Sequence, residues 1–193
     1  MASSATPYGA RPIGTLSASG SYSGKVQHIK IASAYDTNIF YGDFVKIVAA
    51  GTIEKDAGTT SFTPCGVFVG CSYTDPNTSQ KTFAQMWTAS VAASDAVGYI
   101  ITDPALVIQM QCDGSGAQTT LGNNVSLANT SGSTTIGTSK NAVDISTAVA
   151  TTATLPLRII DFVDGPDSSV ADSYTDIIVK YNAGHQYDNT TGI

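Results

Sequence analysis

The chain has few of the residues from which catalytic sites are usually built. Only 12% of its 193 residues are charged, and it holds two histidines, three cysteines and a single glutamate, Glu54. General acids, bases and nucleophiles come mostly from His, Cys, Glu, Asp and Lys held in pockets. The nearest approach to a nucleophile elbow, residues 20–24, has Tyr22 where the serine should stand. We therefore predict no catalytic residues and no enzymatic activity.

Positive charge and long apolar runs are also scarce. Nine Lys and Arg oppose fifteen Asp and Glu, which gives a net charge of −6 and a pI near 4.5. A nucleic-acid partner would need a basic stripe, so none is expected. No run reaches the ~18 apolar residues of a membrane span. Residues 1–22 lack the basic start and apolar block of a secretion signal, so we expect synthesis in a cytoplasm and no membrane partner.

Metal and disulfide signals are weak. Cys65, Cys71 and Cys112 are odd in number and lack metal-ligand spacing, so free thiols in the core are expected. The acidic run Asp161–Asp167 could supply oxygen ligands to Ca²⁺, but its spacing is not that of an EF-hand. Its Asp164-Gly165-Pro166-Asp167 string is also an ordinary turn, and both interpretations stay open. No metal or cofactor is predicted.

Short stretches of alternating apolar and polar residues are abundant, and turn residues separate them. The predicted strands lie at residues 26–31, 44–49, 52–55, 65–73, 82–88, 97–102, 106–112, 155–163 and 175–181. Ala50-Gly51 predicts a hairpin turn, and Gly66 and Gly70 predict bulges or a close approach of another backbone segment. Residues 106–112 could form a short helix, but their β-branched content favours a strand. The pattern indicates an all-β fold, a single antiparallel β-sandwich or barrel-like body.

Composition divides the chain into three parts. Residues 1–24, rich in Ser, Gly, Ala and Pro, predict an extended N-terminal arm or a frayed terminus. Residues 25–181 form the predicted β-rich body, in which 113–154 is an excursion of Ser, Thr and Gly. Residues 182–193 are a predicted C-terminal tail. The arm carries apolar and aromatic side chains that a solvated linker would not need, and we expect them to contact a neighbouring subunit. The full set of predicted contact residues is Tyr8, Arg11, Ile13, Tyr22, Phe40, Tyr41 and Tyr187.

Histidine and aromatic residues have more than one interpretation. His28 alternates with Val26 and Lys30 along a predicted strand, which places it on the solvent face. Aromatic residues could form a platform on which sugars stack, although core and interface packing is their commoner use. These residues are Phe40, Tyr41, Phe44, Phe68, Tyr73, Phe83, Trp87 and Tyr99.

Two blocks of the sequence resemble a known class of proteins. The first comprises residues 41–48, 51–53 and 64–73, and the second comprises 157–166, 176–181 and 185–187. They resemble virion proteins of marine tailed bacteriophages, of the capsid decoration (cement) kind. Residues 113–154 take no part in the resemblance.

The resemblance implies a structural protein on the outer surface of the phage head. Such a protein would bind the major capsid protein and itself, as a homotrimer or a dimer, and would stabilise contacts between capsomers. Many repeated copies would make each modest contact effective. The alternative is a tail or fibre module that binds host-surface glycan through the aromatic set. A third class is an enzyme such as a depolymerase.

Overall fold

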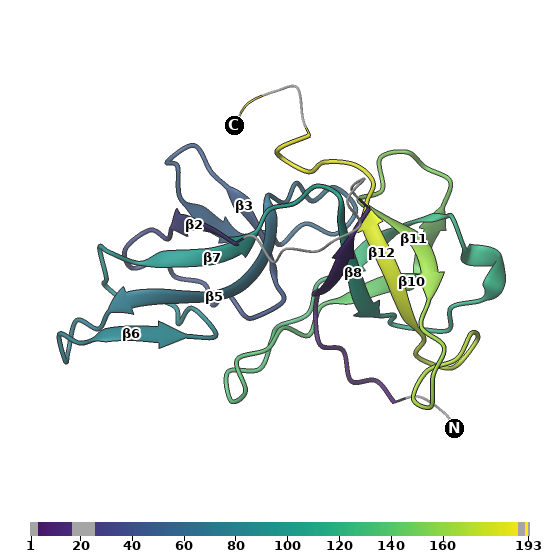
Figure 1. Ribbon diagram of the computed structural model, residues 1–193, viewed down its shortest axis with the longest axis horizontal. Coiled ribbons are helices and arrows are strands. Elements are labelled where there is room, and N and C mark those ends of the chain that lie inside the picture. Colours follow the sequence, from purple (N-terminus) through teal and green to yellow (C-terminus); the bar gives the residue numbers. More distant parts are fainter. Residues whose placement is uncertain (1–3, 17–25, 189–191, 193) are drawn as a thin grey trace.

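The computed structural model describes residues 4–16, 26–188 and 192, and within them the chain is almost wholly β (Figure 1). A single-turn 3₁₀ helix, η1 (Gln118–Thr120), is the one helical element in these ranges. The strands are β1 (Arg11–Thr15), β2 (Val26–Lys30), β3 (Phe44–Ile47), β4 (Ile53–Lys55), β5 (Gly66–Thr74), β6 (Lys81–Ala84), β7 (Val97–Ile101), β8 (Leu106–Gln111), β9 (Asn124–Ala128), β10 (Ala142–Ala150), β11 (Leu157–Phe162) and β12 (Asp176–Tyr181). The all-β prediction is confirmed.

The strands form two antiparallel sheets that lie side by side as two lobes (Figure 1). Sheet A has the order β1-β8-β12-β11-β9-β10, and sheet B has the order β2-β7-β5-β3-β4, with β6 pairing β5. Isolated parallel bridges join Cys112 to Val143 in sheet A and Ile31 to Ile53 in sheet B. Each sheet therefore curls back on itself in the manner of a small barrel, which reduces the exposed strand edges.

One hydrophobic cluster fills sheet B, and a second is shared between the sheets. Alternate side chains of β5 divide between them, because Val67 packs in the shared cluster and Phe68 in the cluster of sheet B. On β7, Ile101 and Ile100 divide in the same way. Sheet B is thus buried on both faces where it meets sheet A, and this burial holds the lobes together.

Most strand predictions are confirmed, and one is wrong in its second half. The β3–β4 hairpin forms, residues 106–111 are a strand, and the β5–β7 register shifts between Phe68 and Gly70. The strand expected at 82–88 ends at Ala84. Because the chain then bends, Phe83 is 73% exposed while Trp87 is fully buried, so the two do not share a face.

The predicted arm and tail are corrected by the structure. Strand β1 pairs with the edge of β8, so residues 11–15 belong to sheet A and are not a free arm. Unsatisfied backbone groups on that edge give the pairing its physical basis. At the other end, the Gln186 side chain exchanges two hydrogen bonds with the backbone of Ile47, at 2.7 and 2.9 Å. Residues 182–188 therefore pack on the body.

The excursion at 113–154 supplies β9 and β10 to sheet A. Between these strands, a loop reaches sheet B, where Thr138 forms a parallel bridge with Tyr41. In the described ranges no helix is long and apolar enough to cross a membrane.

The three cysteines are free and buried, and their chemistry gives a first testable prediction. Burial raises the pKa of both Cys65 and Cys71 to about 12, and it also raises the pKa of Cys112. Since the thiolate is the reactive form, native protein at pH 8 should resist thiol reagents, whereas unfolded protein should label at all three positions. Mass spectrometry of alkylated samples checks this, and rapid labelling of the native protein would contradict it.

Candidate functional site

Three segments that are far apart in the sequence meet at the junction of the two lobes. The Tyr41 N–H donates to the Gly137 carbonyl at 3.0 Å, and the Ser139 N–H donates to the Tyr41 carbonyl at 2.9 Å. From the N-terminal segment, the Gly9 N–H donates to the Asn141 carbonyl at 3.2 Å. The junction thus brings polar side chains from sheet B and from the loop before β10 into one buried cluster.

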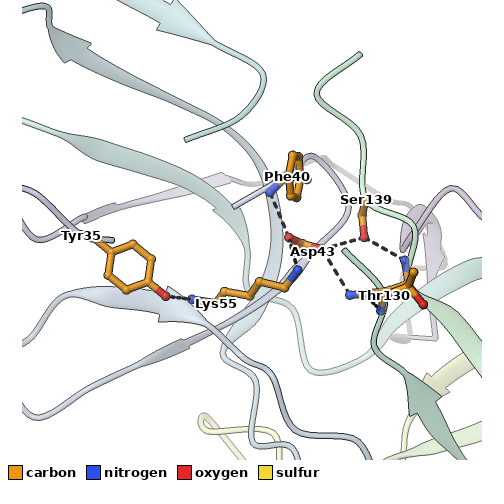
Figure 2. Close-up of polar contacts among 7 residues, drawn as sticks. Tyr35, Phe40, Asp43, Lys55, Thr130 and Ser139 are labelled. Carbon is orange, nitrogen blue, oxygen red and sulfur yellow. Dashed lines mark hydrogen bonds and ion pairs between the residues drawn. The ribbon is translucent and has the colours of Figure 1, made fainter. Parts of the chain in front are cut away.

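The cluster is centred on Asp43, which is fully buried in the turn before β3 (Figure 2). Its Oδ1 accepts hydrogen bonds from the Ser139 hydroxyl at 2.6 Å and from Asn141 Nδ2 at 3.2 Å. Its Oδ2 accepts the Phe40 N–H at 3.0 Å and forms an ion pair with Lys55 Nζ at 3.1 Å. Four donors satisfy the carboxylate, as the burial of a charge requires.

Lys55, at the end of β4, reaches the cluster from sheet B. Its side chain is 10% exposed, and Nζ lies 5.7 Å from the centre of the Phe40 ring. The Lys55 N–H donates to the Tyr35 hydroxyl at 3.0 Å (Figure 2). These contacts fix the amine beside Asp43 and shield it from water.

Asn141, just before β10, reaches the cluster from the side of sheet A. Its Oδ1 accepts the Thr130 N–H at 3.0 Å, and its own N–H donates to Ser139 Oγ at 3.1 Å. Like Asp43, Asn141 is fully buried. The Asn141 carboxamide is therefore held at its oxygen by Thr130 and at its nitrogen by Asp43.

Gly9 allows the segments to approach this closely. Its φ is +77°, a region that disfavours other residues, and a Cβ there would lie 2.5 Å from Ser139 Cβ. No sequence pattern pointed to this cluster. The one available signal is an aspartate directly before an apolar strand, Asp43 before Phe44, and it does not identify the partners.

The cluster offers an amine, a carboxylate, a carboxamide and a hydroxyl in a dry environment. Among the described residues, no group of three or more His, Cys, Asp or Glu side chains could hold a metal ion. The side chains of the cluster can form ion pairs and hydrogen bonds and can exchange protons with one another.

A second contact between the lobes lies at the C-terminal segment. His185 is buried between Tyr181 and Tyr187, with ring centres 4.6 and 6.0 Å away, and burial lowers its pKa. A polar pocket of about 310 Å³ adjoins it. The pocket is lined by Tyr181, Asn182, Ala183, Gly184, His185 and Asp188.

The structure brings together two of the predicted N-terminal contact residues, Tyr8 and Arg11. The Tyr8 hydroxyl donates to Asp176 Oδ2 at 3.0 Å, and the Arg11 guanidinium lies 4.6 Å from the Tyr8 ring centre. Burial, together with Asp176, raises the pKa of Tyr8. Ile13 is 43% exposed on β1. Tyr22 lies outside the described residues.

The other predicted contact residues differ in exposure. Phe40 is 4% exposed and packs under Lys55 and Gly132, so its assignment as a contact residue is wrong. Tyr41 is half-buried at the junction. Tyr187 is exposed, and its hydroxyl donates to Gln27 Oε1 at 2.9 Å. The roles of Tyr41 and Tyr187 as contact residues thus stay predictions.

Half of the aromatic residues that could have formed a sugar-stacking platform lie in the interior, in agreement with core packing as their commoner use. The buried members are Phe40, Phe44, Phe68 and Trp87. The Trp87 indole N–H donates to the Tyr35 carbonyl at 3.3 Å, and the ring meets Tyr73 edge-on. By contrast, His28 is exposed as predicted, beside Tyr99.

The most exposed large apolar side chains occur on two neighbouring segments. Phe83, on β6, is 73% exposed, and Ile136, in the loop before β10, is 63% exposed. A Cβ at Gly137 would lie within 3.7 Å of Gln85 and Met86, so this loop packs beside the chain that leaves β6. We call Phe83 and Ile136 the β6-side surface.

Comparisons of the chain with protein-family models, with curated proteins and with solved structures return no match.

Proposed function

We propose that this chain is a structural virion protein that binds the outer surface of a tailed-phage head and stabilises contacts between capsomers. It acts without substrate turnover, and its partners are the major capsid protein and further copies of itself, as a trimer or a dimer. The single observation that carries the proposal is how the polar and apolar groups are distributed. Buried polar side chains at the junction bind one another, while large apolar side chains at the β6-side surface remain exposed.

The body of the protein is stiff, and its outer surface is available for docking on a partner. Buried contacts hold the two sheets together at the Asp43 cluster and at the C-terminal segment. A stiff body loses little conformational entropy on docking, and exposed apolar side chains supply the area that binding buries.

The resemblance of two sequence blocks to phage decoration proteins supports the same proposal. Its two blocks meet at the junction, where the Phe44 ring centre lies 6.0 Å from that of Tyr181. The two resembling blocks thus contact each other where the lobes meet. The proposed binding surface lies elsewhere, beside β6.

The test is binding to bare heads, which are phage heads assembled without this protein. We expect the purified chain to sediment with such heads, and the Phe83→Ser, Ile136→Ser double variant to bind at least about tenfold more weakly, because a few buried apolar contacts dominate binding energy. Light scattering after size exclusion would report the oligomeric state.

The matched control is Leu121→Ser, since Leu121 is 43% exposed and directly follows η1. The helical turn η1 lies at the end of the molecule opposite β6 (Figure 1). It should bind like the parent. A parent protein that ignores the heads would contradict the proposed function. A double variant that binds as well as the parent would show that the β6-side surface is not the binding surface, and would leave the proposed function itself standing.

A glycan-binding fibre module remains the alternative suggested by the sequence. No feature of the described residues favours it, because the tryptophan on which a sugar platform would depend lies in the core.

A further inference from the structure

The Asp43 cluster places the two reactants of an amide-forming reaction on either side of one carboxylate. Lys55 Nζ lies 3.1 Å from Asp43 Oδ2, and Asn141 Nδ2 lies 3.2 Å from Asp43 Oδ1. Figure 2 shows Lys55 and Ser139 converging on Asp43 from opposite sides. An amine, a carboxamide and a shared proton acceptor are thus held together by contacts across the junction.

We propose that Lys55 and Asn141 become joined by an intramolecular isopeptide bond, which the protein forms on itself after folding. This modification site is independent of the proposed virion role. The reaction occurs once in each chain, and it needs no cofactor or external reactant.

The orientation of the Asn141 carboxamide follows from its partners. The Thr130 N–H can only donate, so the atom that it meets at 3.0 Å is the carbonyl oxygen Oδ1. The amide nitrogen consequently faces Asp43. A hydrogen bond to Oδ1 also stabilises the negative charge that develops on this oxygen when the carbonyl carbon is attacked.

The chemistry balances with these side chains alone. Lys55 Nζ gives one proton to Asp43, and the neutral amine attacks Cγ of Asn141 to form a tetrahedral intermediate. Asp43 then returns the proton to the departing Asn141 nitrogen. The Cγ–Nδ2 bond breaks and the Cγ–Nζ bond remains. The second amine proton passes to the Asp43 carboxylate and from there to the released ammonia, so the products are a secondary amide, one ammonium ion and the regenerated carboxylate.

Burial favours this reaction over competing hydrolysis. The Lys55 side chain is 10% exposed, Asp43 and Asn141 are fully buried, and the Phe40 ring covers the amine. Fixed reactants in a dry site react with high effective concentration. The bond would join β4 of sheet B to the start of β10 in sheet A, and would lock the lobes in a chain whose cysteines are free.

Intact-mass measurement of the denatured parent protein is the deciding experiment. We expect a mass below that of the sequence by one ammonia, about 17 Da, after any removal of the initiator Met is taken into account. Tryptic digestion should yield a branched peptide that contains both Lys55 and Asn141, because a modified lysine resists cleavage.

Two variants identify the atoms involved. Lys55→Arg keeps the positive charge but has no primary amine, and Asn141→Ala has no carboxamide, so each should show its full sequence mass. A parent protein at full sequence mass, also after prolonged incubation, would overturn the proposal. A loss of water in place of ammonia would overturn it too, since it would place the bond on Asp43. A loss of ammonia that persists in Lys55→Arg would also overturn the proposal, because that variant has no primary amine at position 55.

Discussion

Replacing Asp43 with alanine should destabilise the protein more than any other single change at the junction. The substitution leaves the Lys55 amine without its counter-charge and removes the acceptor of the Ser139 hydroxyl and of Asn141. Breaking a buried ion pair by removing one partner costs about 3–5 kcal/mol. Urea unfolding followed by the fluorescence of Trp87, the sole tryptophan, measures the change in the free energy of unfolding.

The protein contains its own matched control for this prediction. Lys81 and Asp95 form an ion pair of nearly the same length, 3.0 Å, but their side chains are 46% and 44% exposed. Exposed pairs contribute little because water screens them. Asp95→Ala should therefore lower stability much less than Asp43→Ala. Equal effects of the two substitutions would show that burial of the junction pair does not matter.

Trp87→Ala should have an effect of similar size for a different reason. Trp87 is fully buried in the cluster of sheet B, where it forms a bridge with Ile39 and packs edge-on against Tyr73. Truncation of a buried aromatic side chain to alanine costs about 3–5 kcal/mol because it leaves a cavity. Far-UV circular dichroism during thermal or urea unfolding reports the loss, since this variant has no tryptophan.

Phe83→Ala is the control for the loss of an aromatic ring. Because Phe83 is 73% exposed, its removal should change stability by no more than about 0.5 kcal/mol. A Trp87→Ala protein as stable as its parent would contradict the core assignment. The comparison also bears on sugar binding, because a loss of binding in Trp87→Ala would reflect a damaged fold.

The candidate site was much harder to predict than the strands. Asp43 and Asn141 are 98 residues apart, and Lys55 belongs to a different hairpin strand. Each is an ordinary residue in its local sequence, so no short motif marks them as partners. The same holds for the bend after Ala84, which no short motif marks and which leaves Phe83 exposed and Trp87 buried.

Local patterns in the sequence were enough to predict the all-β class, the β3–β4 hairpin and the Gly70 bulge, because side-chain alternation and turn chemistry act over a few neighbouring residues. Tertiary structure alone decided that β1 and residues 182–188 belong to the body, and that Asp43, Lys55 and Asn141 meet. These contacts depend on how two sheets pack. Packing follows from the shape and burial of the whole chain, which local sequence patterns do not encode.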